Sequence, residues 1–340
     1  MKYNKLKEEL NNKKVLFVGP VYFGYEKTII SLMEECGAKV DFLQENLDVR
    51  SVVNGLVNKL PVSMCKRIRD VQHKRQLDAL KDNKYDLVFG LRMDFFDDFL
   101  CSLMKKYWPE ARFCLYFWDS CKNMRRPKEV AKYFDKVSSF DRMDCEEMVE
   151  CGWKFRPLFY IKEYEHASRR DNKDIDVLYV SSLFPNRARS YIGLREYCAR
   201  HNLNLKTLFY IKESIYKVQK NKIPEYAAIE SECIRHESID KKEIIELMGR
   251  SKVMFDCSHS RQSGLTMRTV ECVGAEQLLA STNDDLKNYD FYNKENICIL
   301  AEDNFEGLAE FVANSEYEPL NEELYDKYSV ASWLLDIIGA

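Results

Sequence analysis

Short apolar runs alternate with amphipathic stretches along the first half of the chain. Such runs are typical of strands buried in a sheet, and apolar positions spaced three and four apart between them predict helices. The expected strands are 15–19, 40–43, 87–90, 113–118 and 137–140, and the expected helices are 25–36, 95–106, 128–134 and 144–151. Strands that alternate with helices predict a mostly parallel sheet, and so an α/β fold.

The same alternation starts again after a polar stretch at 166–173, which has no apolar periodicity. A loop with Pro185, Arg187 and Arg189 is expected after the first strand of this half, and Gly274 is expected to end a helix. The expected strands are 175–180, 207–210, 233–236, 253–256, 278–280 and 297–300, and the expected helices are 190–200, 241–249, 266–273, 305–312 and 325–338.

Two βα-repeating halves of similar size predict two Rossmann-like domains whose parallel sheets face a central cleft. We expect a first domain at 1–160, a linker at 161–174, a second domain at 175–320, and a C-terminal helix at 321–340 that packs back on the first domain. Neither first loop has the G-x-G-x-x-G pattern, so a dinucleotide site is not expected.

Composition narrows the class further. The 340 residues are 46% hydrophobic and carry a net charge of −3, which gives no electrostatic reason to expect nucleic acid as a partner. No apolar run is long enough to span a membrane, and the charged N-terminal segment lacks the apolar core of a signal peptide. The 12 cysteines are scattered without a C-x-x-C pair. We therefore expect a reduced, cytoplasmic protein without a zinc site.

The segment 253–281 carries the most specific chemistry. It predicts a strand, a polar loop, a helix and a second strand, with Arg268 and Glu271 in the first turns of the helix. Open α/β sheets bind ligands at the carboxyl ends of their strands. The start of the helix offers N–H groups and a positive dipole end, which suit a phosphate, and Arg268 adds a fixed fork of donors.

This segment resembles the donor site of glycosyltransferases with the GT-B fold. The resemblance lies in Gln262-Ser-Gly-Leu-Thr-Met-Arg-Thr-Val-Glu271, followed by Gly274 and the strand 278–281. The lead-in at 239–253 and the phrase Tyr116-Phe-Trp-Asp-Ser120 are also similar to that group. The closest similarity is to bacterial polysaccharide and lipopolysaccharide-biosynthesis enzymes, including the spore-maturation-type branch.

One position departs from the family. Many retaining members carry two glutamates in the spacing E-x7-E, and Glu271 matches the second of them. Ser263 stands at the first position, so the sugar contacts of those members cannot be transferred to this chain. Whether the enzyme retains or inverts the anomeric configuration stays open.

The resemblance implies a nucleotide-diphosphate sugar as donor, bound by the second domain without an essential cofactor or metal. Arg268 would bind the diphosphate and Glu271 the ribose. The alternatives are an ordinary surface ion pair between these two residues, and for Glu271 a helix-dipole role. One of Arg187 and Arg189 would reach the diphosphate or stabilise the transition state; the alternative is a solvated turn. The full set of donor candidates is Arg187, Arg189, His259, Gln262, Gly264, Leu265, Thr266, Arg268 and Glu271.

The first domain would bind the acceptor. Asp119, after the strand 113–118, is the candidate general base, with a helix N-cap as the alternative. Asp94 has a comparable position, but the helix expected after it favours an N-cap. The loop residues Tyr22, Phe23 and Gly24 would line the acceptor side, where the two aromatic rings either stack on a sugar or belong to the core.

A basic stretch at 64–77 predicts an amphipathic helix. It would rest on anionic lipid at the inner face of the membrane, or present a solvated face. Together these features predict a glycosyltransferase that acts on a glycan or lipid-linked acceptor in surface polysaccharide synthesis. The alternatives are a nucleotide-sugar epimerase of the same fold and a non-catalytic nucleotide-sugar-binding partner protein.

Overall fold

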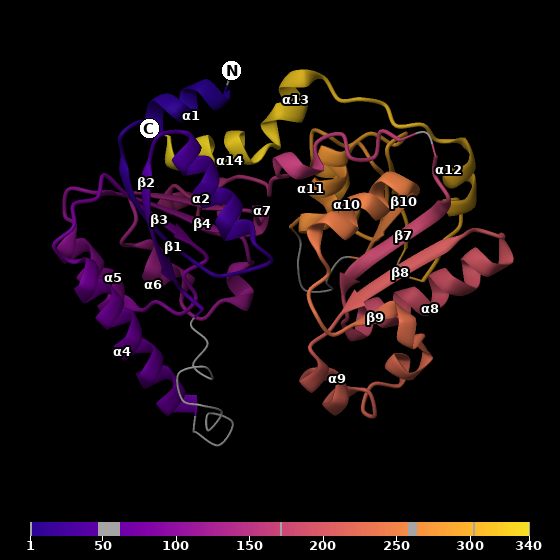
Figure 1. Ribbon diagram of the computed structural model, residues 1–340, viewed down its shortest axis with the longest axis horizontal. Coiled ribbons are helices and arrows are strands. Elements are labelled where there is room, and N and C mark those ends of the chain that lie inside the picture. Colours follow the sequence, from indigo (N-terminus) through magenta and orange to yellow (C-terminus); the bar gives the residue numbers. More distant parts are fainter. Residues whose placement is uncertain (1, 47–61, 171, 258–263, 302, 340) are drawn as a thin grey trace. The chain divides into compact units, whose positions relative to one another are not determined.

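The computed structural model describes residues 2–46, 62–170, 172–257, 264–301 and 303–339, with the backbone alone at 62–66 (Figure 1). The chain divides into two compact units. Unit 1 comprises Met1–Pro157 and Ala331–Ala340, and unit 2 comprises Leu158–Val330. Within the described ranges, no helix combines the length and apolar content that a membrane crossing requires.

Unit 1 is built on a parallel six-stranded sheet with the order β2-β1-β3-β4-β5-β6. Its strands are β1 (Lys14–Gly19), β2 (Lys39–Gln44), β3 (Leu87–Leu91), β4 (Arg112–Phe117), β5 (Lys136–Ser139) and β6 (Lys154–Phe155). Its helices are α1 (Lys2–Leu10), α2 (Tyr25–Glu35), α4 (Val62–Leu80), α5 (Asp98–Tyr107), α6 (Pro127–Ala131), α7 (Arg142–Glu147) and α14 (Val330–Ile338).

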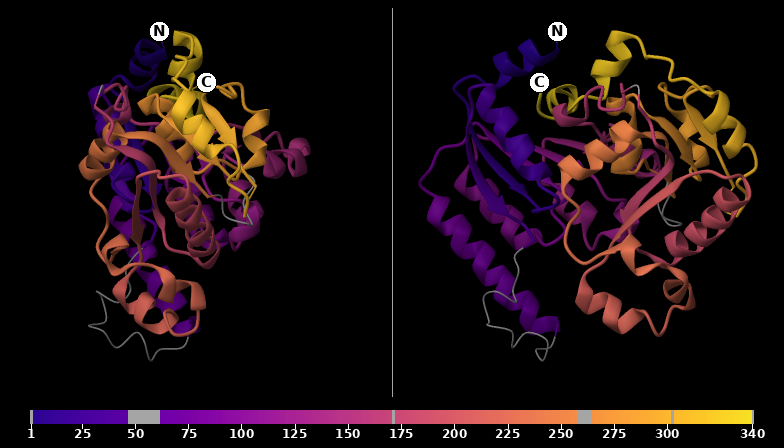
Figure 2. Two further views of the ribbon diagram at one scale, coloured as in Figure 1. Left: turned by 90° about the vertical axis from the view of Figure 1, so that its right-hand side faces the viewer. Right: turned by 45° about the vertical axis from the view of Figure 1, so that its right-hand side comes forward.

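Both faces of this sheet are covered by helices, which explains the continuous apolar runs (Figure 2). Leu16 and Val18 belong to one core cluster together with residues of α4 and α5. On β3 and β4, Phe89 and Tyr116 instead pack against Trp333 of α14, with ring centroids 6.0 and 5.0 Å away. The end of the chain thus completes the core of unit 1.

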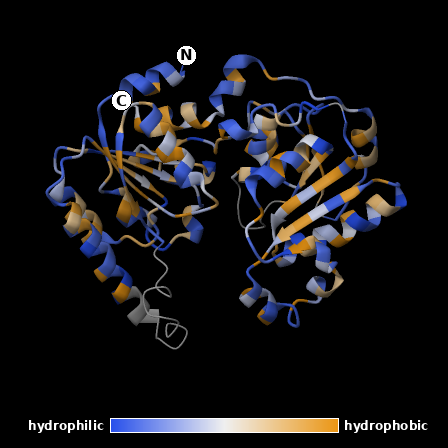
Figure 3. Ribbon diagram, in the orientation of Figure 1, coloured by the Kyte–Doolittle hydropathy of each residue, from blue (hydrophilic) through white to orange (hydrophobic). Residues whose placement is uncertain are grey.

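Unit 2 repeats the architecture with a parallel six-stranded sheet in the order β12-β11-β10-β7-β8-β9. Its strands are β7 (Ile175–Ser182), β8 (Leu205–Tyr210), β9 (Ile234–Arg235), β10 (Ser251–Asp256), β11 (Leu278–Ser281) and β12 (Ile297–Ile299). Its helices are α8 (Pro185–Arg200), α9 (Glu213–Gln219), α10 (Lys241–Arg250), α11 (Met267–Ala275), α12 (Leu308–Asn314) and α13 (Glu322–Lys327). Hydrophobic residues concentrate in the strands of both sheets (Figure 3).

Two helix starts differ from the sequence-based expectation. Helix α8 begins at Pro185 rather than near Ser190, because proline suits the first helical position, where its missing N–H costs nothing. Arg187 and Arg189 therefore lie in a helix and not in a loop. Helix α5 is capped by Asp97, whose side chain accepts from the Leu100 N–H, so the prediction that Asp94 is the N-cap is wrong.

The end of α11 also differs. The helix continues through Gly274 to Ala275, and Glu276 closes it in the left-handed conformation with φ +56°. Residues 162–164, in the stretch expected to be a linker, form a short 3-10 helix in unit 2. The His166 N–H donates to the Gly274 carbonyl and the Ser168 N–H to that of Ala275, which ties this stretch to the end of α11.

Candidate functional site

The carboxyl end of β10 organises the start of α11. Asp256, the last residue of the strand, accepts hydrogen bonds from the hydroxyls of Thr266 (2.5 Å) and Thr269 (3.1 Å). Thr266 Oγ1 in turn accepts from the Thr269 N–H at 3.2 Å, so Thr266 is the N-cap of α11. Its side chain is therefore occupied within unit 2. Asp256 is 3% exposed and was not singled out from the sequence, where it only ends an apolar run.

Arg268 and Glu271 form an ion pair in the first turns of α11, with Nη1 and Oε2 2.5 Å apart. The alternative interpretation predicted this pair, but at the surface. The side chains are only 14% and 5% exposed. Tyr164 is buried beside the pair, and burial, followed by the Glu271 carboxylate, raises the pKa of its hydroxyl. A buried, charge-paired site of this kind is pre-ordered. Nε and Nη1 of Arg268 are themselves buried, as is Oε2 of Glu271.

Arg187 connects the ends of two neighbouring strands of unit 2. Its Nη1 donates to the carbonyl of Ser182, the last residue of β7, and its Nε to the carbonyl of Cys257, directly after β10, both at 3.2 Å. The guanidinium also lies over the ring of Phe184. Arg189, by contrast, is 65% exposed and pairs with Glu225 at 3.1 Å.

The donor candidates thus fall into three groups. Arg187, Thr266, Arg268 and Glu271 lie at the carboxyl edge of the unit 2 sheet, together with the buried residues Gly264 and Leu265 that lead into α11. Arg189 is engaged with η5 (Pro224–Ala228), which holds Glu225. His259, Gln262 and Ser263 lie outside the described residues.

Unit 1 brings Asp119 to the carboxyl end of β4, where its Oδ2 is 2.9 Å from Nε of Arg92. The carboxylate is paired with Arg92 and caps no helix. Burial raises the pKa of Asp119, Arg92 opposes the shift and Asp94 adds to it. Arg92 has φ +70° and the following Met93 φ +61°, a strained conformation that often marks functional positions. Sequence reasoning missed Arg92, because its partner lies on another strand.

Asp94 has a structural task at the same edge. Its Oδ1 accepts from the Arg125 N–H at 2.8 Å, and the residue is 9% exposed. Tyr22 and Phe23, in the loop after β1, are 48% and 43% exposed, so the core interpretation is wrong for both. Gly24 follows them with φ +80° and precedes α2.

Glu45, directly after β2, is fully buried, and burial raises the pKa of its carboxyl to about 7. Its Oε1 accepts from the Phe95 N–H at 2.8 Å, and its backbone carbonyl contacts Nε2 of His73 at 2.9 Å. His73 is also fully buried, and burial lowers its pKa to about 4. Glu45 thus fixes the loop that carries Arg92, although no motif in the sequence singles it out.

The burial of His73 corrects the expected basic face of α4. Of the basic residues in this stretch, Arg67, Lys74 and Arg75 are exposed. His73, in contrast, faces the interior of unit 1 together with the apolar Leu77. Lys74 pairs with Asp78 at 2.6 Å, and Arg69 lies over the Phe95 ring. The side chains of Met64 and Lys66 lie outside the described residues. The exposed basic face is therefore narrower than the sequence predicted.

We expect Glu45→Gln to stabilise unit 1 above neutral pH. The raised pKa means that the folded state holds this proton more tightly than the unfolded chain, whose pKa is near 4.5. The free energy of unfolding therefore falls as pH rises from about 4.5 to about 7. Glutamine keeps the acceptor for the Phe95 N–H but cannot ionise. At pH 8 the variant should gain about 3 kcal/mol, with little difference at pH 4.5.

Urea unfolding followed by tryptophan fluorescence measures this effect, because all four tryptophans lie in unit 1. Glu34→Gln is the matched control, since Glu34 is exposed on α2. A gain of the same size at pH 5 and pH 8 would contradict the assignment of the buried proton to Glu45.

Comparison with known proteins defines the fold. No protein-family profile matches the chain, and no curated protein sequence is significantly similar to it. A glycosyltransferase from Rickettsia africae has a TM-score of 0.63 and 14% identity, over 96% of this chain and 97% of that one. The catalytic domain of starch synthase IV from Arabidopsis thaliana, bound to ADP and acarbose, has a TM-score of 0.52 and 10% identity, over 95% of this chain and 100% of that one.

MurG from Acinetobacter baumannii is also similar, with a TM-score of 0.51 and 10% identity over 95% of this chain and 98% of that one. At such identities the likeness shows the fold alone. The chain has two Rossmann-like domains with parallel six-stranded sheets, and its fold is GT-B-like.

Proposed function

We propose that the protein is a glycosyltransferase that moves a sugar from a nucleotide-diphosphate sugar to a glycan or lipid-linked acceptor in surface polysaccharide synthesis. The likeness to glycosyltransferases over almost the whole chain supports the class. The observation that carries the proposal is the buried Arg268–Glu271 pair at the start of α11. It lies at the edge of the sheet where α/β proteins bind ligands.

In this proposal unit 2 binds the donor. Arg268 and Arg187 stabilise the negative charge that grows on the leaving diphosphate, helped by N–H groups near Gly264 and Leu265. Glu271 accepts from the two ribose hydroxyls. His259 and Gln262 complete the proposed site, whereas Arg189 pairs with Glu225 and Thr266 caps α11. No cofactor is required beyond the donor itself.

Unit 1 binds the acceptor and supplies the base. The acceptor hydroxyl oxygen bonds to the anomeric carbon, the bond from that carbon to the diphosphate oxygen breaks, and the hydroxyl proton passes to Asp119. The raised pKa of the Asp119 carboxylate makes it a better proton acceptor than an aspartate with the usual pKa. Arg92 holds this carboxylate in place.

We also propose that the enzyme is cytoplasmic and touches the inner face of the membrane through the 64–77 stretch. The exposed cations Arg67, Lys74 and Arg75 support a contact with anionic lipid. Most of the described part of α4 is hydrophilic (Figure 3).

A panel of UDP, GDP, CDP, dTDP and ADP tests the donor site. We expect one of them to raise the melting temperature of the protein, because a ligand that binds the folded state stabilises it. Arg187→Gln and Arg268→Gln should each weaken that nucleotide at least about tenfold, the effect of losing one charge-assisted hydrogen bond. Titration calorimetry gives the affinities.

The matched control is Arg200→Gln, an exposed arginine at the far end of α8, which should leave the affinity unchanged. Arg268→Gln leaves Glu271 buried without its guanidinium and so also lowers stability. Circular dichroism at the titration temperature establishes that the variant is folded. Equal nucleotide affinity in the wild type and both site variants would refute the donor assignment.

A further inference from the structure

Three aromatic side chains form a cluster at the carboxyl edge of the unit 1 sheet. The rings of Tyr22 and Phe23 have centroids 4.5 Å apart, and Trp118, directly after β4, is half-buried with its centroid 5.9 Å from Tyr22. Both β1 and β4 pair with β3, so their ends meet at one edge. A group of exposed aromatic side chains indicates a binding site more often than a single exposed side chain does.

The loop that carries Tyr22 and Phe23 is held firmly. The Val21 N–H donates to Oδ1 of Asn46 at 2.8 Å, and Nδ2 of Asn46 donates back to the Val21 carbonyl at 3.2 Å. The Tyr22 N–H donates to Oε2 of Glu26, a residue that is 3% exposed. These bonds fix the backbone at Val21 and Tyr22, next to the exposed rings. Rings that are already ordered lose little entropy when a ligand binds.

Backbone strain keeps one ring turned outward. Phe23 adopts φ +51°, a left-handed conformation that costs a residue other than glycine about 1–3 kcal/mol. Phe23 packs on Tyr22 but stays 43% exposed in this conformation. Strained residues of this kind cluster at sites that bind ligands, and here the strained residue presents an exposed ring.

Hydrogen-bonding groups border the aromatic cluster. Asp119 follows Trp118 in the chain and pairs with Arg92 at 2.9 Å, which sets an acceptor and a donor side by side. A sugar ring offers both matching surfaces, a C–H face for an aromatic ring and hydroxyls that donate and accept. An alkyl chain would instead cover the Arg92–Asp119 pair without bonding to it, at a cost in desolvation.

We infer that the cluster of Tyr22, Phe23 and Trp118, bordered by Arg92 and Asp119, binds a pyranose ring. The inference rests on the proposed function in one respect, that this ring belongs to the acceptor. It makes the acceptor a carbohydrate, free or lipid-linked, whose terminal sugar stacks on the rings while one hydroxyl reaches Asp119. Sugar binding itself needs no nucleotide.

Acrylamide quenching of tryptophan fluorescence tests the inference on the full chain. Trp108, Trp153 and Trp333 are at most 7% exposed, so quenching reports mainly on Trp118. The probes are methyl α- and β-pyranosides of glucose, galactose, mannose and N-acetylglucosamine. We expect at least one to protect Trp118. Tyr22→Ala should weaken it about fivefold, because one stacking contact contributes about 1 kcal/mol, and Tyr22→Phe should preserve binding.

Phe99→Ala is the control, since Phe99 is 55% exposed on α5 of the same unit. Octyl β-glucoside below its micelle concentration distinguishes a lipid-linked acceptor from a free one. Tighter binding than that of the methyl glucoside indicates a lipid-linked sugar, and equal binding indicates a free glycan. Protection by the octyl compound with no methyl pyranoside active would overturn the inference, as would protection by none of them or full protection in Tyr22→Ala. Nucleotide binding to unit 2 is measured separately, so failure of either proposal leaves the other standing.

Discussion

Asp119→Asn is expected to lower turnover about a hundredfold or more and to leave the nucleotide affinity within about twofold of the wild type. Asparagine has nearly the same shape as aspartate, and its carbonyl oxygen can still accept from Arg92. It cannot take up a proton from the acceptor hydroxyl. The loss should therefore appear in the chemical step and not in donor binding, for which we propose unit 2.

The measurement is the initial rate of nucleoside diphosphate release from the sugar donor whose nucleotide the binding panel selects, with a protecting pyranoside as acceptor. The rate should fall on the acidic side as Asp119 becomes protonated. Arg92 lowers the pKa of Asp119, so Arg92→Gln should move this acidic limb to higher pH. A purely structural role for Arg92 would reduce the rate without moving the limb.

Asp98→Asn is the matched control, because Asp98 is an exposed aspartate of α5 in the same unit. It should turn over normally. Normal turnover in Asp119→Asn would show that another group accepts the proton. A parallel loss of nucleotide affinity would show that Asp119 supports the fold of the enzyme instead of its chemistry.

The architecture was predictable from the sequence because the central strands of each sheet are buried on both faces. Phe17 and Leu16 face opposite sides of the first sheet, and both are fully buried. A strand buried on both faces must be a continuous apolar run, and such runs are easily found. The predicted α/β class and its two Rossmann-like halves are confirmed.

Helix boundaries were less predictable where two local signals compete. Proline can mark a loop or a first helical turn, and at Pro185 it does the second. Asp94 and Asp97 both precede an apolar helix, but only Asp97 caps it. The choice depends on distant groups: the Arg125 N–H engages Asp94, and Glu45 engages the Phe95 N–H. A single sequence contains no record of these contacts.

The residues of the candidate site also divide into those that could be selected from the sequence and those that could not. Arg268, Glu271 and Asp119 could be selected because each follows a strand in a recognisable segment. Arg92, Glu45 and Trp118 could not, because their importance comes from neighbours on other strands. Tyr164 was missed for another reason: it lies in the segment expected to be a linker, at 161–174, yet its ring is buried beside the Arg268–Glu271 pair.

Gly274→Ala is expected to destabilise unit 2 by at least about 3 kcal/mol, the upper part of the range for an overpacked core. A Cβ at this position would lie 2.5 Å from Cγ of Tyr160 and 2.7 Å from its Cβ. Two carbon atoms cannot approach so closely, and the near atoms belong to the base of the Tyr160 side chain. The helix and the segment at 158–170 would therefore have to separate.

Tyr160 has little freedom to move away. Its backbone N–H donates to the Tyr328 carbonyl at 2.9 Å, its carbonyl accepts from the Val330 N–H at 2.8 Å, and its hydroxyl donates to the Tyr325 carbonyl at 3.0 Å. Between these hydrogen bonds, Ser329 forms an isolated parallel β-bridge with Tyr160. At this point the helix predicted at 325–338 is interrupted and divides into α13 and α14. Tyr325 in turn donates to the Gly274 carbonyl at 2.6 Å.

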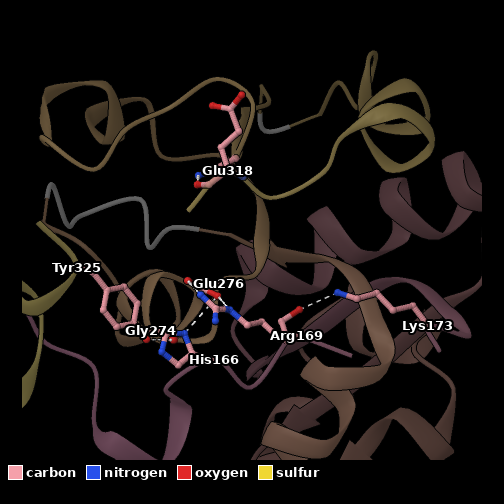
Figure 4. A network of polar contacts seen from close by, with 9 residues as sticks. His166, Arg169, Lys173, Gly274, Glu276, Glu318 and Tyr325 are labelled. Carbon is pink, nitrogen blue, oxygen red and sulfur yellow. Dashed lines mark hydrogen bonds and ion pairs between the residues drawn. The ribbon is translucent and has the colours of Figure 1, made fainter. Parts of the chain in front are cut away.

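The same contact organises the end of α11. Glu276 there pairs with Arg169 and with Nδ1 of His166, and the His166 ring stacks on Tyr325 with centroids 5.1 Å apart (Figure 4). Displacing Tyr160 would disturb this network and shift Tyr164, which lies four residues further along the same segment. We therefore expect Gly274→Ala to weaken nucleotide binding as well, although Gly274 itself makes no proposed donor contact.

Thermal melts followed by circular dichroism report the stability of both units, whereas tryptophan fluorescence reports the stability of unit 1 alone. Gly193→Ala on α8 is the control: its Cβ would meet only a ring atom of Phe305 at 3.0 Å, and the gain in helix propensity offsets that contact. Combining Gly274→Ala with Tyr160→Ala should cost less than the sum of the two changes, because the clash is removed. Strict additivity would show that the two residues do not interact, and the steric explanation would have to be abandoned.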